Sequence, residues 1–167
     1  ADGIYILPVN GVKFELYHFI LDKLKIFNII KTDNDLRVAK RGNTYSVYSV
    51  LGFSRCNNYI KKKLLPTTQL QENSISAKRK LYDDNKEKLN KIRDAHHIFL
   101  SRVDLENDLD EVLHNRLIDL LEENSPVDYL QDAKHYHMVE LVEKLTDEDC
   151  ETIYNHYNFA CLKEIAE

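Results

Sequence analysis

Residues 4–31, IYILPVNGVKFELYHFILDKLKIFNIIK, carry the strongest fold signal in the chain. The apolar run at 4–9 has the length of a buried strand, and the Asn-Gly pair after it signals a turn. Apolar residues then recur at helical spacing, which predicts a helix over 14–25 that closes in lysines. Residues 26–31 form a second apolar run of strand length. A strand, a helix and a strand in this order form a βαβ unit, which implies a parallel sheet.

The rest of the chain extends this pattern. The alternating stretch 45–51 predicts a strand or the approach to a helix, and 97–101 predicts another short strand. The polar stretch 66–76 predicts a surface loop. Helices are predicted over 53–65, 77–93, 105–123, 132–146 and 148–165. We therefore expect an α/β fold, with a parallel sheet flanked by helices and a helical C-terminal part.

Composition excludes several classes of protein. The chain has 167 residues, enough for one domain with its own core. Its apolar runs are far shorter than the ~18 residues of a membrane span, and from the residues given we expect no signal peptide. The three cysteines are widely spaced, which favours free thiols in a reducing cytoplasm. The four glycines stand too far apart for a glycine-rich nucleotide loop.

Charge is distributed unevenly along the chain. Residues 1–36 have a net charge of −1, from four Lys/Arg and five Asp/Glu. Residues 37–93 have a net charge of +10, from fourteen Lys/Arg and four Asp/Glu. Residues 94–167 have a net charge of −14, from five Lys/Arg and nineteen Asp/Glu. The middle block is a candidate contact for a polyanion such as nucleic acid, or alternatively a solvated helical surface. Its candidate contacts are Lys61, Lys62, Lys63, Lys78, Arg79 and Lys80.

Two pairs of acids follow predicted strands. Asp33 and Asp35 come after the run at 26–31, and Asp104 and Glu106 come after the strand at 97–101. Ligands bind beyond the carboxyl ends of parallel strands, and closely spaced carboxylates can hold Mg²⁺ ions there. Alternatively, the first pair caps a turn, and the second pair caps and begins the next helix.

Lys134 is a further candidate. It lies four residues before Met138, on the apolar stripe of the helix predicted over 132–146. A cation in the first turn of a helix is unfavourable next to the helix dipole. Lys134 therefore needs an anion nearby, such as a phosphate, or its side chain extends past the core edge into solvent.

Four segments in this order resemble the TOPRIM nuclease region of the OLD (overcoming lysogenization defect) family of ATP-dependent endonucleases, including its Gabija-like members. They are 6–11 (ILPVNG), 29–35 (IIKTDND), 99–109 (FLSRVDLENDL) and 134–142 (KHYHMVELV). The resemblance covers roughly residues 3–146 and implies a TOPRIM-like Rossmannoid sheet. The family's opening acid-Gly-x-x-Glu motif and its ATPase part have no counterpart here. We therefore expect this chain to be the C-terminal part of a longer polypeptide.

The resemblance also implies a chemistry. Asp33, Asp35 and Glu106, with Asp104 or Ser101 assisting, would hold two Mg²⁺ or Mn²⁺ ions. Asp33, Glu106 and Lys134 would act in catalysis, Lys134 by stabilising charge on the phosphate.

The implied protein is a DNA endonuclease or nickase in anti-phage defence. ATP would act only through a separate ATPase domain, and a homo-oligomer is expected.

We divide the chain into a TOPRIM-like core over 1–110, with a basic helical insert at about 52–95, and a helical part over 111–167 that carries Lys134. One other function stays open at this point. The acidic helices after residue 104 could dock a partner or assemble an oligomer, with the acids acting only as caps. Such a protein would be a non-catalytic interaction module that binds no metal.

Overall fold

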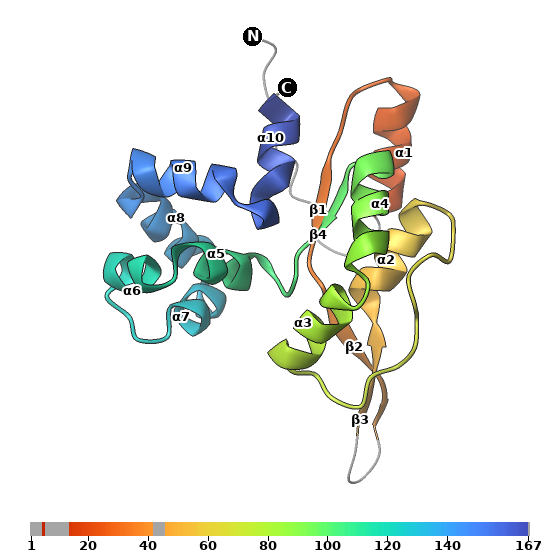
Figure 1. Ribbon diagram of the computed structural model, residues 1–167, viewed down its shortest axis with the longest axis horizontal. Helices are drawn as coiled ribbons and strands as arrows, with labels where there is room; N and C mark the ends of the chain where they lie inside the picture. The colour runs from red at the N-terminus through yellow and green to blue at the C-terminus, as the bar shows by residue number, and fades with distance from the viewer. Residues whose placement is uncertain (1–4, 6–13, 42–45, 167) are drawn as a thin grey trace. The chain divides into compact units, whose positions relative to one another are not determined.

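The computed structural model describes residue 5 and residues 14–41 and 46–166 (Figure 1). Its backbone divides into two compact units, residues 1–100 and 101–167, and each is described by itself. The functional division proposed from the sequence, between residues 110 and 111, stays a prediction. In the described residues, no helix combines the length and the apolar character needed to cross a membrane.

The first unit contains a parallel pair of short strands. Strand β1 (Ile30–Thr32) pairs with β4 (Ile98–Leu100), with Ile30 opposite Ile98 and Thr32 opposite Leu100. This pairing confirms the α/β class with a parallel sheet. The run at 26–31 therefore contributes only its last residues to a strand. The strand predicted at 4–9 lies outside the described residues.

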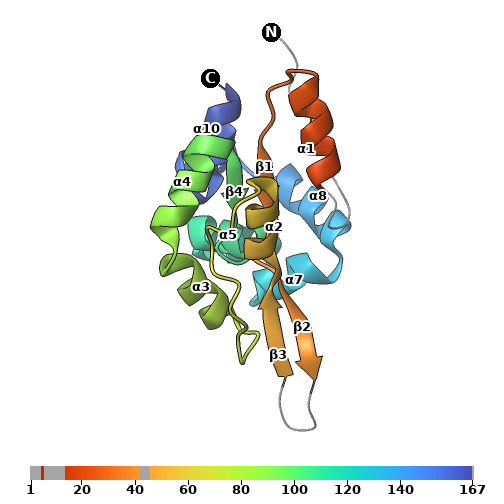
Figure 2. The same ribbon diagram turned by 90° about the vertical axis from the view of Figure 1, so that its right-hand side faces the viewer.

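Three helices of the first unit contribute to its core or pack near the parallel pair. Helix α2 (Leu51–Tyr59) buries Phe53 and Cys56 completely. Helix α4 (Lys86–His96) packs against β4 (Figure 2), and its Ile92 is buried. Full burial of a side chain such as Phe53 contributes about 1.5–3 kcal/mol to stability. Helix α3 (Ile75–Asp83) precedes α4. The helix predicted over 77–93 is thus two helices. The buried Asn85 separates them, because its side chain bonds back to the Leu81 carbonyl oxygen.

Helix α1 (Phe14–Lys23) confirms the helix predicted near the start of the chain. Its apolar side chains are largely exposed, with Leu16, Phe19 and Ile20 at 62%, 51% and 45%. None of these three belongs to the stripe of Tyr17, Leu21 and Leu24 that gives the predicted helical spacing, so α1 is apolar on more than one side.

An antiparallel hairpin in the first unit was not predicted. Strand β2 (Leu36–Arg41) pairs with β3 (Ser46–Val50), and the register shifts between Val38 and Lys40, which marks a β-bulge. The alternating stretch at 45–51 therefore contains strand β3, and its last residue, Leu51, begins α2. The partner of β3 was missed because the bulge interrupts the two-residue alternation of β2.

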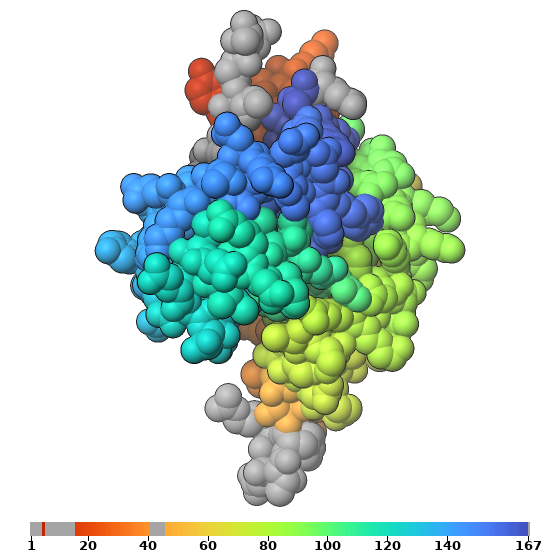
Figure 3. Space-filling view, turned by 60° about the vertical axis from the view of Figure 1, so that its left-hand side comes forward, coloured from red at the N-terminus to blue at the C-terminus, as the bar shows by residue number. Residues whose placement is uncertain are grey.

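The second unit is entirely helical in its described part and confirms the helical C-terminal part. Its elements are α5 (Leu105–Leu113), α6 (Asn115–Leu121), α7 (Pro126–Asp132), α8 (Lys134–Lys144), α9 (Asp147–Asn155), the 3-10 turn η1 (Tyr157–Phe159) and α10 (Ala160–Ala166). Leu117, Leu130 and Leu141 are almost completely buried in its core. Figure 3 shows these helices packed into a continuous surface, coloured teal to blue.

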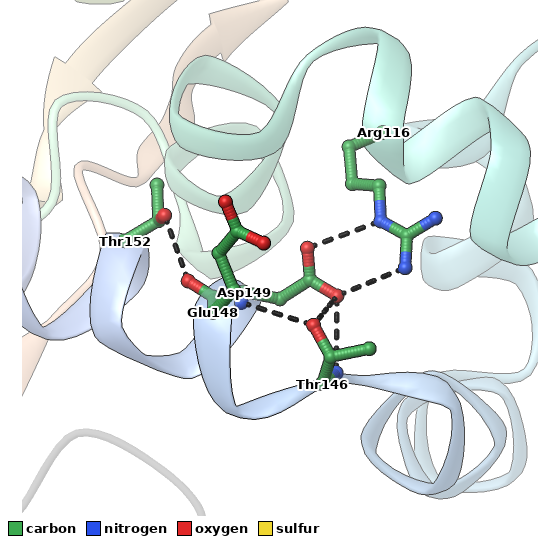
Figure 4. A network of polar contacts seen from close by, with 5 residues as sticks. All are labelled: Arg116, Thr146, Glu148, Asp149 and Thr152. Carbon is green, nitrogen blue, oxygen red and sulfur yellow. Dashed lines mark hydrogen bonds and ion pairs between the residues drawn. The ribbon is translucent and has the colours of Figure 1, made fainter.

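Breaks in the predicted helices have local causes. The helix expected over 105–123 is interrupted at His114, whose φ of 43° ends α5. Helix α9 begins at a capping box, in which Thr146 and Asp149 bond reciprocally to each other's backbone N–H groups (Figure 4). Arg116 of α6 donates two hydrogen bonds to the Asp149 carboxylate, each 3.1 Å long. This network ties α6 to the start of α9.

Candidate metal and nucleic-acid site

The acidic turn after β1 is held against the first turn of α2. The backbone N–H groups of Leu51 and Gly52 both donate to the carbonyl oxygen of Asp35, at 2.9 and 3.1 Å. No side chain caps this helix, so the turn's own carbonyl satisfies two of its free donors. The buried Asn34 anchors the turn from another side by donating to the Lys78 carbonyl oxygen at 3.1 Å.

Gly52 makes this close approach possible. A Cβ atom at this position would lie 2.7 Å from the Asp33 carbonyl oxygen, 2.9 Å from the Asn34 Cα and 3.2 Å from the Asp35 nitrogen. All three atoms belong to backbone and have little freedom to yield. The conformation of the acidic turn therefore depends on Gly52, which lies about twenty residues further along the chain.

The Asp35 side chain is oriented by an arginine from α2. Arg55 donates from Nη1 to Asp35 Oδ2 at 2.8 Å and to Thr32 Oγ1 at 3.3 Å. The Asp35 side chain stays 41% exposed, and Asp33 is half-buried. The Asp35 carboxylate is thus held by a cation at Oδ2, and its side chain remains partly accessible from solvent.

Asp104 has the capping role that the sequence left open. Its Oδ1 accepts from the backbone N–H of Asn107 at 2.9 Å and from the Asn107 side chain at 2.8 Å. Its Oδ2 accepts from Gln131 Nε2 at 3.0 Å. Both carboxylate oxygens are therefore engaged in starting α5 and tying it to α7. A metal-binding role for Asp104 stays a prediction.

Glu106 occupies a very different environment two residues later. Its side chain is 1% exposed, and Oε1 lies 2.7 Å from the ammonium nitrogen of Lys134. This contact is an ion pair by distance, although its angles are not those of a hydrogen bond. Within residues 14–41 and 46–166, Oε2 of Glu106 has no hydrogen-bond partner. A buried carboxylate oxygen without a donor is costly, and an added cation would relieve that cost.

Lys134 itself is half exposed, with 53% of its side chain in solvent. It begins α8, and its ammonium group lies against the buried Glu106. A lysine in the first turn of a helix needs a nearby anion, and here that anion is the Glu106 carboxylate of the same chain. The structure brings two of the predicted catalytic residues into contact.

Contacts between α7 and α8 fix the position of Lys134, the first residue of α8. The Tyr129 ring stacks on His137 with centroids 3.6 Å apart, and its hydroxyl donates to Glu140 at 2.7 Å. That hydrogen bond raises the pKa of Tyr129 to about 12. Hydrogen bonds from Lys144 and then from Tyr129 lower the pKa of Glu140. These contacts hold α8 in a defined rotation against α7.

Two buried polar residues beside Glu106 were not found by sequence reasoning. Asn107 and Asp108 are 5% and 1% exposed, and Asp108 Oδ1 accepts from the backbone N–H of Arg102 at 3.4 Å. Acids in a first helical turn are normally solvated, so the pattern contains no signal for their burial. The start of α5 therefore places three consecutive polar side chains out of solvent.

The six basic candidates lie at different depths. Lys61–Lys63 follow the C-cap residue of α2 and are exposed, and Lys61 has a φ of 53°. Lys78 and Arg79 on α3 are half-buried. Lys80 is exposed but forms an ion pair with Asp84 at 2.7 Å. The exposed run after α2 is the part best suited to meet a polyanion.

The metal site as a whole stays a prediction. Strands β1 and β4 end at the same edge of their sheet, and the chain continues there into Asp33 and Ser101 respectively. Ser101 is 1% exposed. Among the described residues, no group of three or more His, Cys, Asp and Glu side chains is arranged to hold a metal ion.

Comparison with known proteins gives one informative result. No family model matches the chain. The chain is 37% identical to Endonuclease GajA of Bacillus cereus (strain VD045) over 174 aligned positions, which cover 98% of this chain. It spans about 30% of that relative's length. Nearly the whole chain is thus similar to part of an endonuclease.

Proposed function

We propose that this chain is the nuclease part of a larger endonuclease that hydrolyses phosphodiester bonds in DNA with the help of divalent metal ions. The observation that carries the proposal is the similarity to an endonuclease along 98% of the chain. It is supported by the buried pair of Glu106 and Lys134, which stands where the TOPRIM resemblance expects an acid and a lysine. Asp33 and Asp35 supply the acid-x-acid element of the same resemblance.

The donor chemistry fits Mg²⁺ or Mn²⁺. Carboxylate oxygens are the ligands that these ions prefer, and Glu106 Oε2 has no hydrogen-bond donor among the described residues. We assign Glu106, Asp33 and Asp35 as the residues that would hold the metal, with Ser101 or Asp104 assisting. Bound ions would activate a water molecule and neutralise the scissile phosphate.

Lys134 has the position and exposure for a phosphate-directed role. Its ammonium group compensates the buried Glu106 carboxylate, and half of its side chain remains in solvent. We propose that it donates to a non-bridging phosphate oxygen, where negative charge develops in the transition state. The stacked corner of Tyr129 and His137 would keep this charge in place.

The wider setting is proposed from the resemblance. The enzyme would act in the cytoplasm in defence against phage, as a homo-oligomer, and would be controlled by ATP through a separate ATPase domain. The exposed lysines at 61–63 would hold the DNA backbone without reading its sequence.

The decisive experiment is Glu106→Gln in the full-length protein, assayed on supercoiled plasmid with Mg²⁺ or Mn²⁺. This change removes one negative charge at nearly constant volume. We expect cleavage to fall by about 100-fold or more, because a metal ligand is lost. Glu143→Gln on α8 is the matched control, since Glu143 is exposed, and it should cleave as the unmodified protein does.

A second readout tests metal binding apart from cleavage. Isothermal titration with Mn²⁺ should show saturable binding that is weakened in both Glu106→Gln and Asp35→Ala. Full cleavage and unchanged Mn²⁺ binding in both variants would refute the assigned roles. That outcome would favour the non-catalytic interaction module instead.

A further inference from the structure

The β2–β3 hairpin belongs to the longest acid-free stretch of the first unit. From Leu36 to Gln71 the chain contains seven Lys and Arg residues and no Asp or Glu. This stretch covers both hairpin strands, α2 and the loop in which Leu70 forms a bridge with Tyr48 of β3. No carboxylate lies within the stretch, and of its seven cations Arg55 is paired with Asp35, which directly precedes it.

The bulge in β2 places two cations on one face of the hairpin. Arg37 lies opposite Ser49, and after the register shift Lys40 lies opposite Val47. Paired residues share a face, and residues 47 and 49 are two apart, so Arg37 and Lys40 lie on the same face. In a regular strand, residues three apart would point to opposite faces.

Both cations are available to a ligand. Arg37 and Lys40 are exposed, and within the described ranges no carboxylate forms an ion pair with either. Arg55 and Lys80 of the same unit differ, because they are paired with Asp35 and Asp84. Figures 1 and 2 show the paired strands extending away from the helices of the first unit.

We propose that the β2–β3 hairpin is a duplex-DNA contact, in which the ribbon lies in a groove and Arg37 and Lys40 bind the flanking phosphates. This inference rests on the proposed function and adds a contact surface that the six basic candidates do not include. A major groove about 12 Å wide admits a two-stranded β-ribbon. Contacts to phosphate position the duplex without selecting a sequence.

The test is duplex binding by the full-length protein at several salt concentrations, with EDTA present so that the DNA stays intact. Each phosphate contact contributes about 0.9 to the slope of log K against log salt. Arg37→Gln with Lys40→Gln should therefore lower the slope by about 1.8 and weaken binding by about 50-fold near 0.1 M salt. Lys23→Gln with Lys25→Gln, on exposed residues at the end of α1, removes the same charge and should change little.

A second pair of variants separates the face from the net charge. Lys40→Gln and Val38→Glu both lower the charge by one, but Val38 pairs with Tyr48 on the opposite face. We expect a clearly larger loss of binding from Lys40→Gln.

Equal losses from these two variants, or an unchanged salt slope in the Arg37 and Lys40 double variant, would overturn the hairpin proposal. Such results leave the nuclease proposal standing, because that proposal depends on the cleavage assay of Glu106→Gln. Conversely, normal cleavage by Glu106→Gln would refute the assigned chemistry without affecting the DNA-binding result.

Discussion

Replacing Gly52 by alanine should destabilise the acidic turn that carries Asp33 and Asp35. The new Cβ atom would lie 2.7 Å from the Asp33 carbonyl oxygen, where ordinary contacts need about 3.5 Å. The turn or the helix must therefore move by about 0.8 Å, which is overpacking against backbone. That movement also strains the two hydrogen bonds that Asp35 accepts from the first turn of α2.

The expected magnitude follows from three terms. Overpacking costs about 1–3 kcal/mol, and weakening the two hydrogen bonds adds about 1 kcal/mol. Alanine returns up to about 1 kcal/mol through its higher helix propensity. We therefore expect a net loss of about 1–3 kcal/mol in the free energy of unfolding.

Urea titration of the 167-residue chain, followed by far-ultraviolet circular dichroism, measures this loss. Asn58→Ala is the matched control, because Asn58 is exposed on the same helix and alanine should there be neutral or slightly stabilising. The steric argument is refuted if Gly52→Ala is as stable as the unmodified chain.

Three further predictions concern stability and reactivity. Hydrogen bonds from Arg116 lower the pKa of Asp149 to about 2 from 3.8, so its stabilising contribution is complete above pH 3.8 and is lost as the pH falls through 2. Between pH 5 and pH 2, the melting temperature of Arg116→Gln should fall less than that of the unmodified chain. An identical pH dependence of the two melting temperatures would contradict this. Burial raises the pKa of Cys56 to about 12, so a thiol reagent should label the exposed Cys150 in the native chain and Cys56 only after unfolding. Ser74 caps α3, so Ser74→Ala should cost about 1 kcal/mol in a urea titration, and no change would argue against the cap.

Much of the fold could be predicted from local patterns. The α/β class, the strands near residues 30 and 98 and the helical C-terminal part follow from apolar periodicity, which is a property of neighbouring residues. The pairing of these two strands with each other was not predicted. The breaks at Asn85 and His114 could not be predicted, because they depend on one side-chain bond and one backbone angle. The β2 strand was missed for a related reason, since its bulge is defined only by pairing with β3.

The candidate site divides in the same way. Chain order alone identifies Asp104 and Glu106 as acids at the start of a helix, and it allows each to be a cap or a metal ligand. Their environments differ because Asp104 is the N-cap residue, with an extended backbone and a side chain bonded to the Asn107 N–H, whereas Glu106 lies within the first turn of the helix. One carboxylate therefore closes the helix end, and the other enters the core against Lys134. Which of two similar acids is buried depends on what packs around the helix, and that is a property of the folded chain.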